Sequence, residues 1–238
     1  MEERKGNWFQ TFTGKIFYTL DPREEEIDIR DIAHPLSLSC RFQGHCYYFY
    51  SIGEHCIRTK MIAMALLMKK GADTLEINPA EVAFWSLFHD AAESYIGDMN
   101  APLKADMKQY KEIEEGLLTV IGKKYGFHYP MSKQVAEIVH KADKIMLATE
   151  LRDILAKAPQ PWDNDEQPSE DMVIVPYSSQ EVERIFLGEY YNITKRVPQL
   201  KKMQEQARQI PRTQPGFIGA EGGFKMAQVN EGKKDEQN

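Results

Sequence analysis

The sequence predicts a mainly α-helical protein with a single domain, in which short strands are only an addition. Helix-start signals at Ser51 and Asn78 stand directly before long apolar segments. Glycines at positions 97 and 126 follow the last residues of helical spacing. The chain has 238 residues, 42% of them hydrophobic, which is enough for one large domain or two small ones.

The first fifty residues give the weakest pattern. Residues 11–30 ("TFTGKIFYTLDPREEEIDIR") are compatible with a short hairpin. From there to Phe49 we expect a bent helix, interrupted by Pro35 and followed by a loop, because proline cannot donate the helical hydrogen bond.

Helix N-terminal signals in the sequence predict where two of the helices begin. Ser51 and Glu54 form a capping box that opens the apolar segment "HCIRTKMIAMALLMKK". Asn78 caps the next helix, with proline at its first position and an acid at its third. Gly97 ends it, so that one continuous helix is expected between these two residues.

Three further segments keep helical spacing. The first ends at Gly126, the second runs from Ser132 to the residues before Pro159, and the third starts at the "SSQE" motif. The buried stripe of the third is expected to contain Val182, Ile185, Phe186, Tyr190 and Ile193.

The composition changes after Ile210. The last 28 residues hold five of the fifteen glycines and little periodic hydrophobicity. We therefore predict a domain over residues 1–210 and a flexible or partner-binding tail over residues 211–238.

Charge and cysteine usage narrow the function classes. A net charge of −6 argues against nonspecific binding of nucleic acid. No apolar run approaches the roughly 20 residues of a membrane span, and the N-terminus lacks a signal-peptide core. The three cysteines form no C-x-x-C pair, so we expect reduced thiols and a cytoplasmic protein.

Three ionic residues directly follow the apolar run "VAFWSLF". Glu93 lies four residues after His89 and three after Asp90, which places the three side chains in one sector of a helix. Removing such groups from water is costly unless something compensates, and a divalent metal does so. The alternative is a helix end at which these side chains reach solvent or cap their neighbours.

Two residues elsewhere extend this set. His55 lies one turn into an apolar helix, and Asp143 interrupts the apolar pattern of another. Each alone is more often a hydrogen-bonded core residue. Together with His89 and Asp90 they offer two imidazoles and two carboxylates, a set that suits a divalent transition metal (Mn, Fe, Co, Zn or Ni). Structural zinc sites are usually closed and rich in thiolates, so this set suits them poorly.

These residues carry a resemblance to a known family. The pattern H…HD…D in a helical chain resembles the HD-domain metal-dependent phosphohydrolases, and "HDAAESYIGDMNAPLK" is similar to the corresponding stretch of bacterial 5′-deoxynucleotidases. The segment "IRDIAHPLSLSCRFQGHCYYFYSIGEH" resembles bacteriophage-type members, including dATP triphosphohydrolases. The likeness covers roughly residues 11–160 and implies an all-α HD-domain helical bundle.

The resemblance also implies roles for the site residues. The metal ligands would be His55, His89, Asp90 and Asp143. Glu93 would position or deprotonate the attacking water, and Asp98 would be a second acid beside it. Asp98 follows a helix C-terminus, where a negative charge is disfavoured; a simple turn aspartate is the alternative.

Four residues are candidates for contacting substrate. The resemblance implies that Arg41 binds the phosphate and that Phe42 supplies an aromatic ring, where the family has tryptophan. Lys104 is either a second phosphate contact or a solvated lysine. Glu150 lies two turns beyond Asp143 and could receive a sugar hydroxyl or a base amino group, or pair with an arginine such as Arg152 or Arg41. Four other histidines are expected to be structural or exposed: His34, His45, His128 and His140.

The expected activity is hydrolysis of a nucleotide 5′-phosphate ester. The resemblance to phage enzymes gives a weak preference for a deoxynucleoside triphosphate such as dATP, and the deoxynucleotidase resemblance implies monophosphates. A triphosphate would need extra basic side chains, for which Lys104, Lys108, Lys111 and Arg58 are candidates. The rivals are a phosphodiesterase on cyclic or oligomeric nucleotides, for which no second metal-ligand set is evident, and a nucleotide-binding regulator without turnover. By analogy, self-association into homo-oligomers is also expected.

Overall fold

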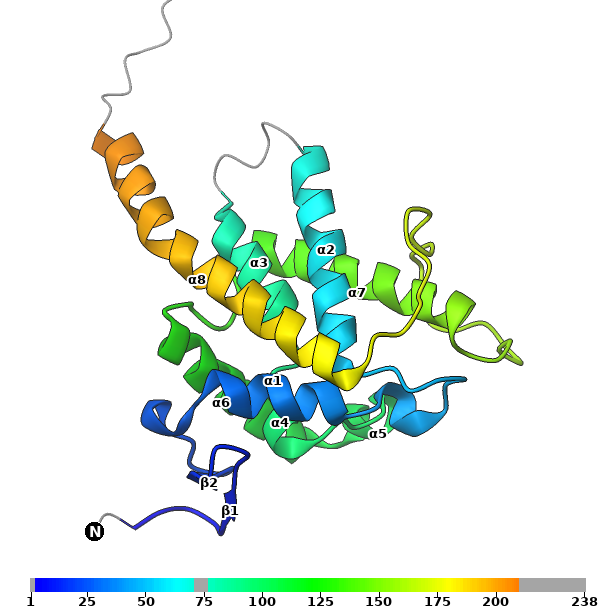
Figure 1. Ribbon diagram of the computed structural model, residues 1–238, viewed down its shortest axis with the longest axis horizontal. Helices are drawn as coiled ribbons and strands as arrows, with labels where there is room; N and C mark the ends of the chain where they lie inside the picture. The colour runs from blue at the N-terminus through cyan, green and yellow to red at the C-terminus, as the bar shows by residue number, and fades with distance from the viewer. Residues whose placement is uncertain (1–2, 71–76, 210–238) are drawn as a thin grey trace, which may run out of the picture.

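The computed structural model describes residues 3–70 and 77–209, and the side chains of the last helix only as far as residue 195. The described part is a helical bundle with one small hairpin (Figure 1). The all-α prediction is therefore confirmed. Its elements are β1 (Trp8–Gln10), β2 (Ile16–Tyr18), the 3-10 turns η1 (Glu24–Glu26) and η2 (Arg41–Gly44), and the helices α1 (Ile29–Leu38), α2 (Ile52–Lys70), α3 (Pro79–Phe88), α4 (Glu93–Ile96), α5 (Ala101–Asp106), α6 (Lys108–Tyr125), α7 (Lys133–Asp153) and α8 (Ser179–Gln209).

The centre of the bundle is α2, which packs against both α3 and α7. Helix α8 lies across α1, α2 and α3 on the other side (Figure 1). Apolar side chains from all these helices form one core, and burying a large apolar side chain contributes about 1.5–3 kcal/mol. The largest fully buried side chains are Trp85, Tyr50, Phe17, Phe84, Phe88 and Phe186.

The predicted helix starts are confirmed by their caps. The Ser51 hydroxyl accepts the backbone N–H of Glu54 at 3.1 Å, and the Asn78 side chain accepts that of Ala80 at 3.0 Å. The second half of the predicted capping box is wrong. The Glu54 carboxylate accepts hydrogen bonds from Arg58 instead of turning back to residue 51.

The N-terminal hairpin is present but starts earlier than predicted. Its strands pair Trp8 with Tyr18 and Gln10 with Ile16, and its turn is closed by Gly14, whose φ is 81°. The segment predicted from residue 11 holds only the turn and the second strand. Helix α1 continues for three residues past Pro35 instead of being interrupted at it.

The continuous helix predicted from Asn78 to Gly97 is divided in the structure. Helix α3 ends at Phe88, and α4 begins only at Glu93. The backbone N–H of Glu93 bonds to the carbonyl of Asp90, three residues back, and Gly97 ends α4 with φ 77°. The tighter turn places the histidine–aspartate pair at a helix end, where Asp90 lines a cavity.

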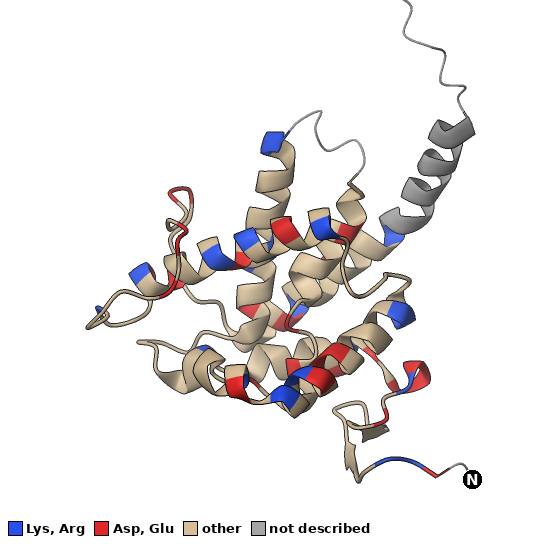
Figure 2. Ribbon diagram, turned by 180° about the vertical axis from the view of Figure 1, so that it is seen from behind, with Lys and Arg blue, Asp and Glu red and all other residues tan. Residues whose placement is uncertain are grey.

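The chain's surface carries charges of both signs. Lys and Arg alternate with Asp and Glu along α6 and α7 (Figure 2). No helix among residues 3–70 and 77–209 is long and apolar enough to cross a membrane. The predicted tail at 211–238 lies outside the described residues.

Candidate active site

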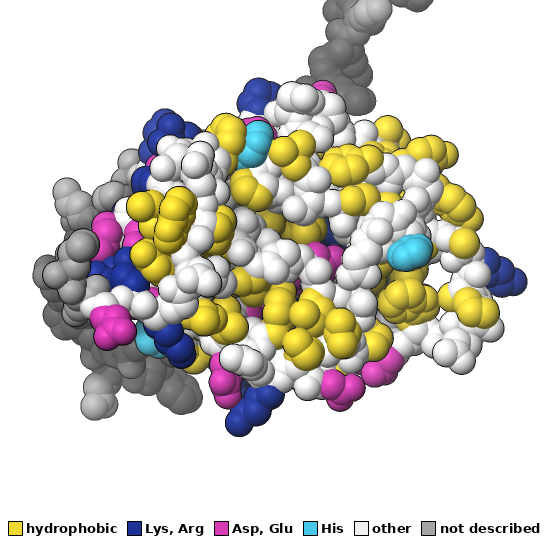
Figure 3. Space-filling view, turned by 90° about the horizontal axis from the view of Figure 1, so that it is seen from below, with side chains coloured by type: hydrophobic (Ala, Val, Ile, Leu, Met, Phe, Trp, Pro, Cys, Tyr) yellow, Lys and Arg dark blue, Asp and Glu magenta, His cyan; other side chains and the backbone are white. Residues whose placement is uncertain are grey.

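The candidate metal ligands come together where three helices meet. His55 is on α2, His89 and Asp90 follow α3, and Asp143 is on α7. Asp90 and Asp143 line a cavity of about 460 Å³, which is also lined by Arg41, and the two histidines lie behind these aspartates. The face of the molecule seen from below in Figure 1 carries many hydrophobic side chains, with acidic side chains visible in the hollow between them (Figure 3).

Each of the two imidazoles has a hydrogen-bond acceptor beside its Nδ1, which determines where that nitrogen's proton lies. His55 is fully buried, and its Nδ1 lies 2.7 Å from a carboxylate oxygen of Glu150. His89 Nδ1 lies 3.0 Å from the backbone carbonyl of Ser86. Both partners are acceptors. The Ser86 group is a carbonyl, and the Glu150 carboxylate stays ionised, because burial raises its pKa but Arg41 and His55 lower the pKa by more. Each Nδ1 therefore donates its hydrogen, and Nε2 is the atom that offers a lone pair to a metal on the side of Asp90 and Asp143. Burial and Arg41 lower the pKa of His55, but Glu150 and Asp143 raise it by more, to about 9, so His55 Nε2 holds a proton when no metal is bound.

The two lone pairs face each other and two carboxylates. His55 Nε2 lies 3.1 Å from His89 Nε2, 3.0 Å from an Asp143 oxygen and 3.7 Å from an Asp90 oxygen. His89 Nε2 lies 3.4 Å from the same Asp90 oxygen and 3.8 Å from the Asp143 oxygen. Four acceptors at such distances repel one another unless a proton or a metal cation lies between them. The residues therefore fit a divalent metal with mixed nitrogen and oxygen ligands.

The ligand atoms form two overlapping groups. His55, His89 and Asp143 form one, and Cys56, His89 and Asp90 form the other. Sequence reasoning missed Cys56, because a lone cysteine on an apolar helix has no metal-binding spacing. Its thiol is fully buried, and burial raises its pKa well above the ordinary range, so it suits the metal less well than the carboxylates.

Glu93 and Asp98 lie on the same cavity. Glu93 is 6% exposed, and its Oε2 has no hydrogen-bond partner among the described residues. Burial raises the pKa of Glu93 well above the usual range, and Asp90 and Asp98 add to the effect. A buried carboxylate oxygen without a partner is costly, and a water or substrate group in the cavity would satisfy it.

Arg41 enters the cavity from the η2 turn, and Phe42 lines the cavity beside it. Arg41 Nη1 lies 3.4 Å from Asp90, and Nη2 lies 3.3 Å from Glu150. Burial lowers the pKa of Arg41, but Glu150 and Asp90 raise it by more, so the guanidinium is charged. Its Nε is buried and has no partner among the described residues, so it can still donate to a ligand.

Two roles were predicted for Glu150, a contact with substrate or an ion pair with an arginine, and the structure supports the ion pair. It is fully buried and does not line the cavity, so the expected direct contact with a sugar or base has no support in the structure. It pairs with Arg41, as one alternative had it, and not with Arg152, which bonds to Asp153. Its bond to His55 was not predicted, because sequence spacing places Glu150 relative to Asp143 on its own helix but not relative to α2.

Lys104 lines the cavity and is half-buried. Its ammonium bonds to Glu114, so it is neither freely solvated nor unpaired. Of the other histidines, His34 bonds to Glu183 at 3.0 Å and stacks on Phe12, away from the candidate ligands. The remaining three also lie outside the cavity lining: His45, His128 and His140.

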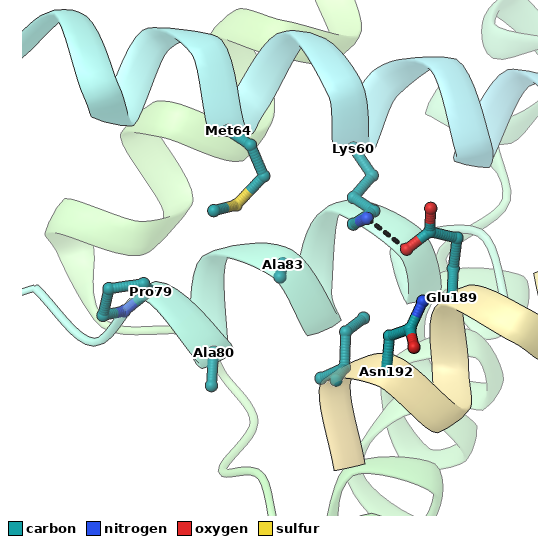
Figure 4. A pocket seen from close by; sticks show the side chains of 8 residues that line it. Lys60, Met64, Pro79, Ala80, Ala83, Glu189 and Asn192 are labelled. Atoms are coloured by element: carbon teal, nitrogen blue, oxygen red, sulfur yellow. Dashed lines mark hydrogen bonds and ion pairs between the residues drawn. The ribbon is translucent and has the colours of Figure 1, made fainter. Parts of the chain in front are cut away.

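A second cavity of similar size, about 470 Å³, lies between α2, α3 and α8 (Figure 4). Met64, Ala83 and Ile193 contribute apolar walls, and its one ion pair joins Lys60 to Glu189. Of the described residues that line it, none is a histidine or an unpaired acid, so the chemistry of the cluster around His55 places the candidate active site at the other cavity.

Comparison with known proteins agrees with this geometry. Residues 44–158 match the family described as 5′-deoxynucleotidase YfbR-like. The chain is 40% identical over 148 residues to a protein of Escherichia coli K12 named uncharacterized protein YfdR, a match that covers 62% of this chain and 72% of that one. The chain belongs to the YfbR-like family. It is thus a metal-dependent nucleotide phosphohydrolase of the HD type.

Two proteins that match a shorter part of the chain are named 5′-deoxynucleotidase. A protein of Erwinia tasmaniensis named 5′-deoxynucleotidase is 34% identical over 70 residues, which is 27% of this chain and 35% of that protein. A 5′-deoxynucleotidase of Photobacterium profundum is 36% identical over 69 residues, 27% of this chain and 36% of that one. The matched family region includes all four candidate ligands and Glu93, whereas Arg41 and Phe42 lie just before it.

Proposed function

We propose that the protein is a 5′-deoxynucleotidase, which hydrolyses deoxynucleoside monophosphates to a deoxynucleoside and phosphate. The observation that carries this proposal is the cluster of two Nε2 lone pairs and two carboxylates beside the unpartnered carboxylate of Glu93. The named relatives from Erwinia and Photobacterium support the same activity.

In this proposal His55, His89, Asp90 and Asp143 hold the metal. When bound, a divalent ion supplies Lewis-acid stabilisation of the phosphoryl group and lowers the pKa of a water. Glu93 orients that water and accepts its proton as the water oxygen attacks phosphorus. The bond from phosphorus to the 5′-oxygen breaks, and the proton held by Glu93 passes to the leaving oxygen. Asp98 is the second acid beside the water.

Arg41 binds the phosphate in this scheme. Its position is held by Glu150 and Asp90, so its ordering precedes substrate binding. Donors fixed in advance cost little reorganisation during the reaction, which increases their contribution in a site that excludes water. Glu150 acts here through Arg41 and His55, as a positioning residue.

A deoxynucleoside triphosphate, the weakly preferred substrate in the sequence analysis, is the second candidate. The charges of the cavity favour the monophosphate. Among the described lining residues only Arg41 and Lys104 are basic, and both already bond to carboxylates. The other cations considered for a triphosphate lie outside the lining: Arg58, which pairs with Glu54; Lys108, which is highly exposed; and Lys111.

Turnover assays decide between these substrates. Metal-loaded protein is incubated with the four deoxynucleoside monophosphates and the four triphosphates, and the products are separated by chromatography. Nucleoside and phosphate from monophosphates, abolished in Glu93→Gln, would establish the proposal. Nucleoside and triphosphate from a triphosphate would favour the second candidate. No turnover of either set by a protein with bound metal would overturn both.

A further inference from the structure

We propose that Trp162 is the nucleobase platform of the active-site cavity, and that its indole stacks on the base of the bound nucleotide. This inference rests on the proposed nucleotidase function and adds how the site holds the part of the substrate that does not react. Trp162 lies beyond residues 44–158, so the matched family region does not include it.

The first observation is the composition of the cavity. Its lining includes an ionic part, to which the candidate metal ligands Asp90 and Asp143 belong, and a wall of large apolar side chains. We define this apolar wall as Phe42, Met99, Pro102, Leu147 and Trp162. A nucleotide has the same division between a charged phosphate and a flat, largely apolar base.

The second observation is the direction from one part to the other. Leu147 follows Asp143 by four residues on α7, so the two lie on one helix face about 6 Å apart along its axis. A phosphate bound near Asp143 would therefore place its sugar beside Leu147, with the base directed toward the apolar wall. Trp162 is the largest side chain in that wall.

The third observation is how Trp162 is held. It lies in the irregular segment between α7 and α8, which is fastened to α7 immediately after Asp143. The side-chain amide of Asn164 donates a hydrogen bond to the backbone carbonyl of Lys144 at 2.9 Å. The backbone N–H of Asn164 donates to the backbone carbonyl of Trp162, also at 2.9 Å. The Lys144 ammonium also pairs with Asp165 at 2.8 Å. The backbone of Trp162 is thus held relative to a candidate metal ligand.

The fourth observation is that the indole is only partly covered. Trp162 is 48% exposed, and no aromatic ring within the described part of the chain packs against it. Trp85, in contrast, is buried and packs against Phe84 and Tyr129. A half-exposed aromatic ring that lines a cavity beside other apolar side chains is a group on which a base can stack. Because every base has a flat aromatic face, stacking predicts that all four deoxynucleotides bind.

The test separates the base from the phosphate. KM and kcat are measured for a deoxynucleoside monophosphate and for deoxyribose 5-phosphate, which lacks the base. Trp162→Ala should raise KM for the nucleotide on the order of tenfold, with kcat little changed, and leave KM for the sugar phosphate unaltered. Trp162→Phe should restore most of the affinity, and Trp8→Ala, at another exposed tryptophan, should match the parent protein.

Two results would overturn the proposal. Equal effects of Trp162→Ala on both substrates would show a structural role, and an unchanged KM for the nucleotide would show that the base lies elsewhere. The Phe variant keeps the test valid if the Ala variant does not fold.

A binding measurement distinguishes failure of the proposed base platform from failure of the proposed nucleotidase function. In a Trp8→Phe protein, deoxynucleosides without phosphate should quench tryptophan fluorescence, and Trp162→Phe should abolish this quenching. Quenching without turnover would keep the base platform and reject the activity. Absence of quenching by deoxynucleosides, at concentrations that saturate turnover of the nucleotide, would reject the platform and keep the activity.

Discussion

The ionic part of the cavity and its apolar wall differ in how their side chains are held. In the ionic part Arg41 bonds to two carboxylates, and directly behind it His55 and Glu150 are fully buried and bonded to each other. In the wall Leu147 is half-buried and Trp162 is exposed, and apolar contacts such as theirs are not directional. Hydrogen bonds fix geometry to fractions of an ångström, whereas apolar contacts supply mainly area.

This difference assigns the two parts different tasks. The ionic part is arranged before substrate binds, which is what phosphoryl hydrolysis requires of its charges. The wall can accept bases of different shape, since stacking is tolerant of base identity. Changes in the ionic part should therefore reduce kcat or metal content, and changes in the wall should act on KM.

The largest expected effect is that of removing the metal. Chelation should abolish turnover and lower Tm, because a metal that binds only the folded protein adds its binding free energy to stability, and a proton on His55 replaces only part of its contacts. Differential scanning fluorimetry and metal analysis follow the two changes, and re-addition of Mn²⁺ or Co²⁺ should reverse both. Full activity in protein shown to be free of metal would contradict the metal site.

Glu93→Gln should come next, with kcat reduced by about 10²–10⁴-fold, because the amide cannot accept the proton of the attacking water. Its shape is nearly unchanged and it is not among the candidate ligands, so metal content should stay at the parent level. Ser94→Ala, at the next position along the chain, serves as the control. Loss of metal in Glu93→Gln would instead make this residue a ligand.

Glu150→Gln should weaken metal binding by about 10–100-fold, although Glu150 does not line the cavity. The amide keeps the volume but removes the charge that fixes the His55 tautomer and orders Arg41. Metal titration monitored by calorimetry measures the change, and Glu137→Gln, an exposed acid on the same helix, is the matched control. Parent metal affinity in Glu150→Gln would refute the positioning role.

Much of the ionic part could be predicted from the sequence, and less of its surroundings. Helical spacing places His89 and Asp90 in one sector with Glu93. The full ligand set, with His55 and Asp143, was implied by the resemblance to the HD-domain phosphohydrolases. Spacing contains no information on which side chains of different helices meet. The pair between Glu150 and His55 joins α7 to α2 across 95 residues, and only the packed structure brings it together.

The apolar wall was missed for a related reason. Trp162 lies in an irregular segment with no periodicity, where an exposed aromatic residue has no distinguishing pattern. The same limit applies to the division of the helix between Asn78 and Gly97. Its residues fit a continuous helix, and the tight turn at Asp90 depends on bonds that the pattern does not specify.

A smaller effect is expected where the two parts of the cavity meet. On the expectation that Lys104 is a second phosphate contact, Lys104→Ala should raise KM by about three- to tenfold and change kcat little, a modest effect because its ammonium already bonds to Glu114. Lys108→Ala removes an exposed lysine outside the cavity lining and should leave KM unchanged. A fall in kcat without a change in KM would place Lys104 in the chemical step instead.

The smallest expected effect concerns the segment that carries Trp162. The ion pair of Lys144 with Asp165 is exposed on both sides, and such pairs contribute little, so Asp165→Asn should change neither Tm nor KM. Asn164→Ala removes the hydrogen bond to the carbonyl of Lys144 and should raise KM for nucleotides about twofold. Steady-state kinetics on the two variants compares them directly. If Asp165→Asn had the larger effect, long-range charge and not backbone hydrogen bonding would hold the apolar wall beside the metal ligands.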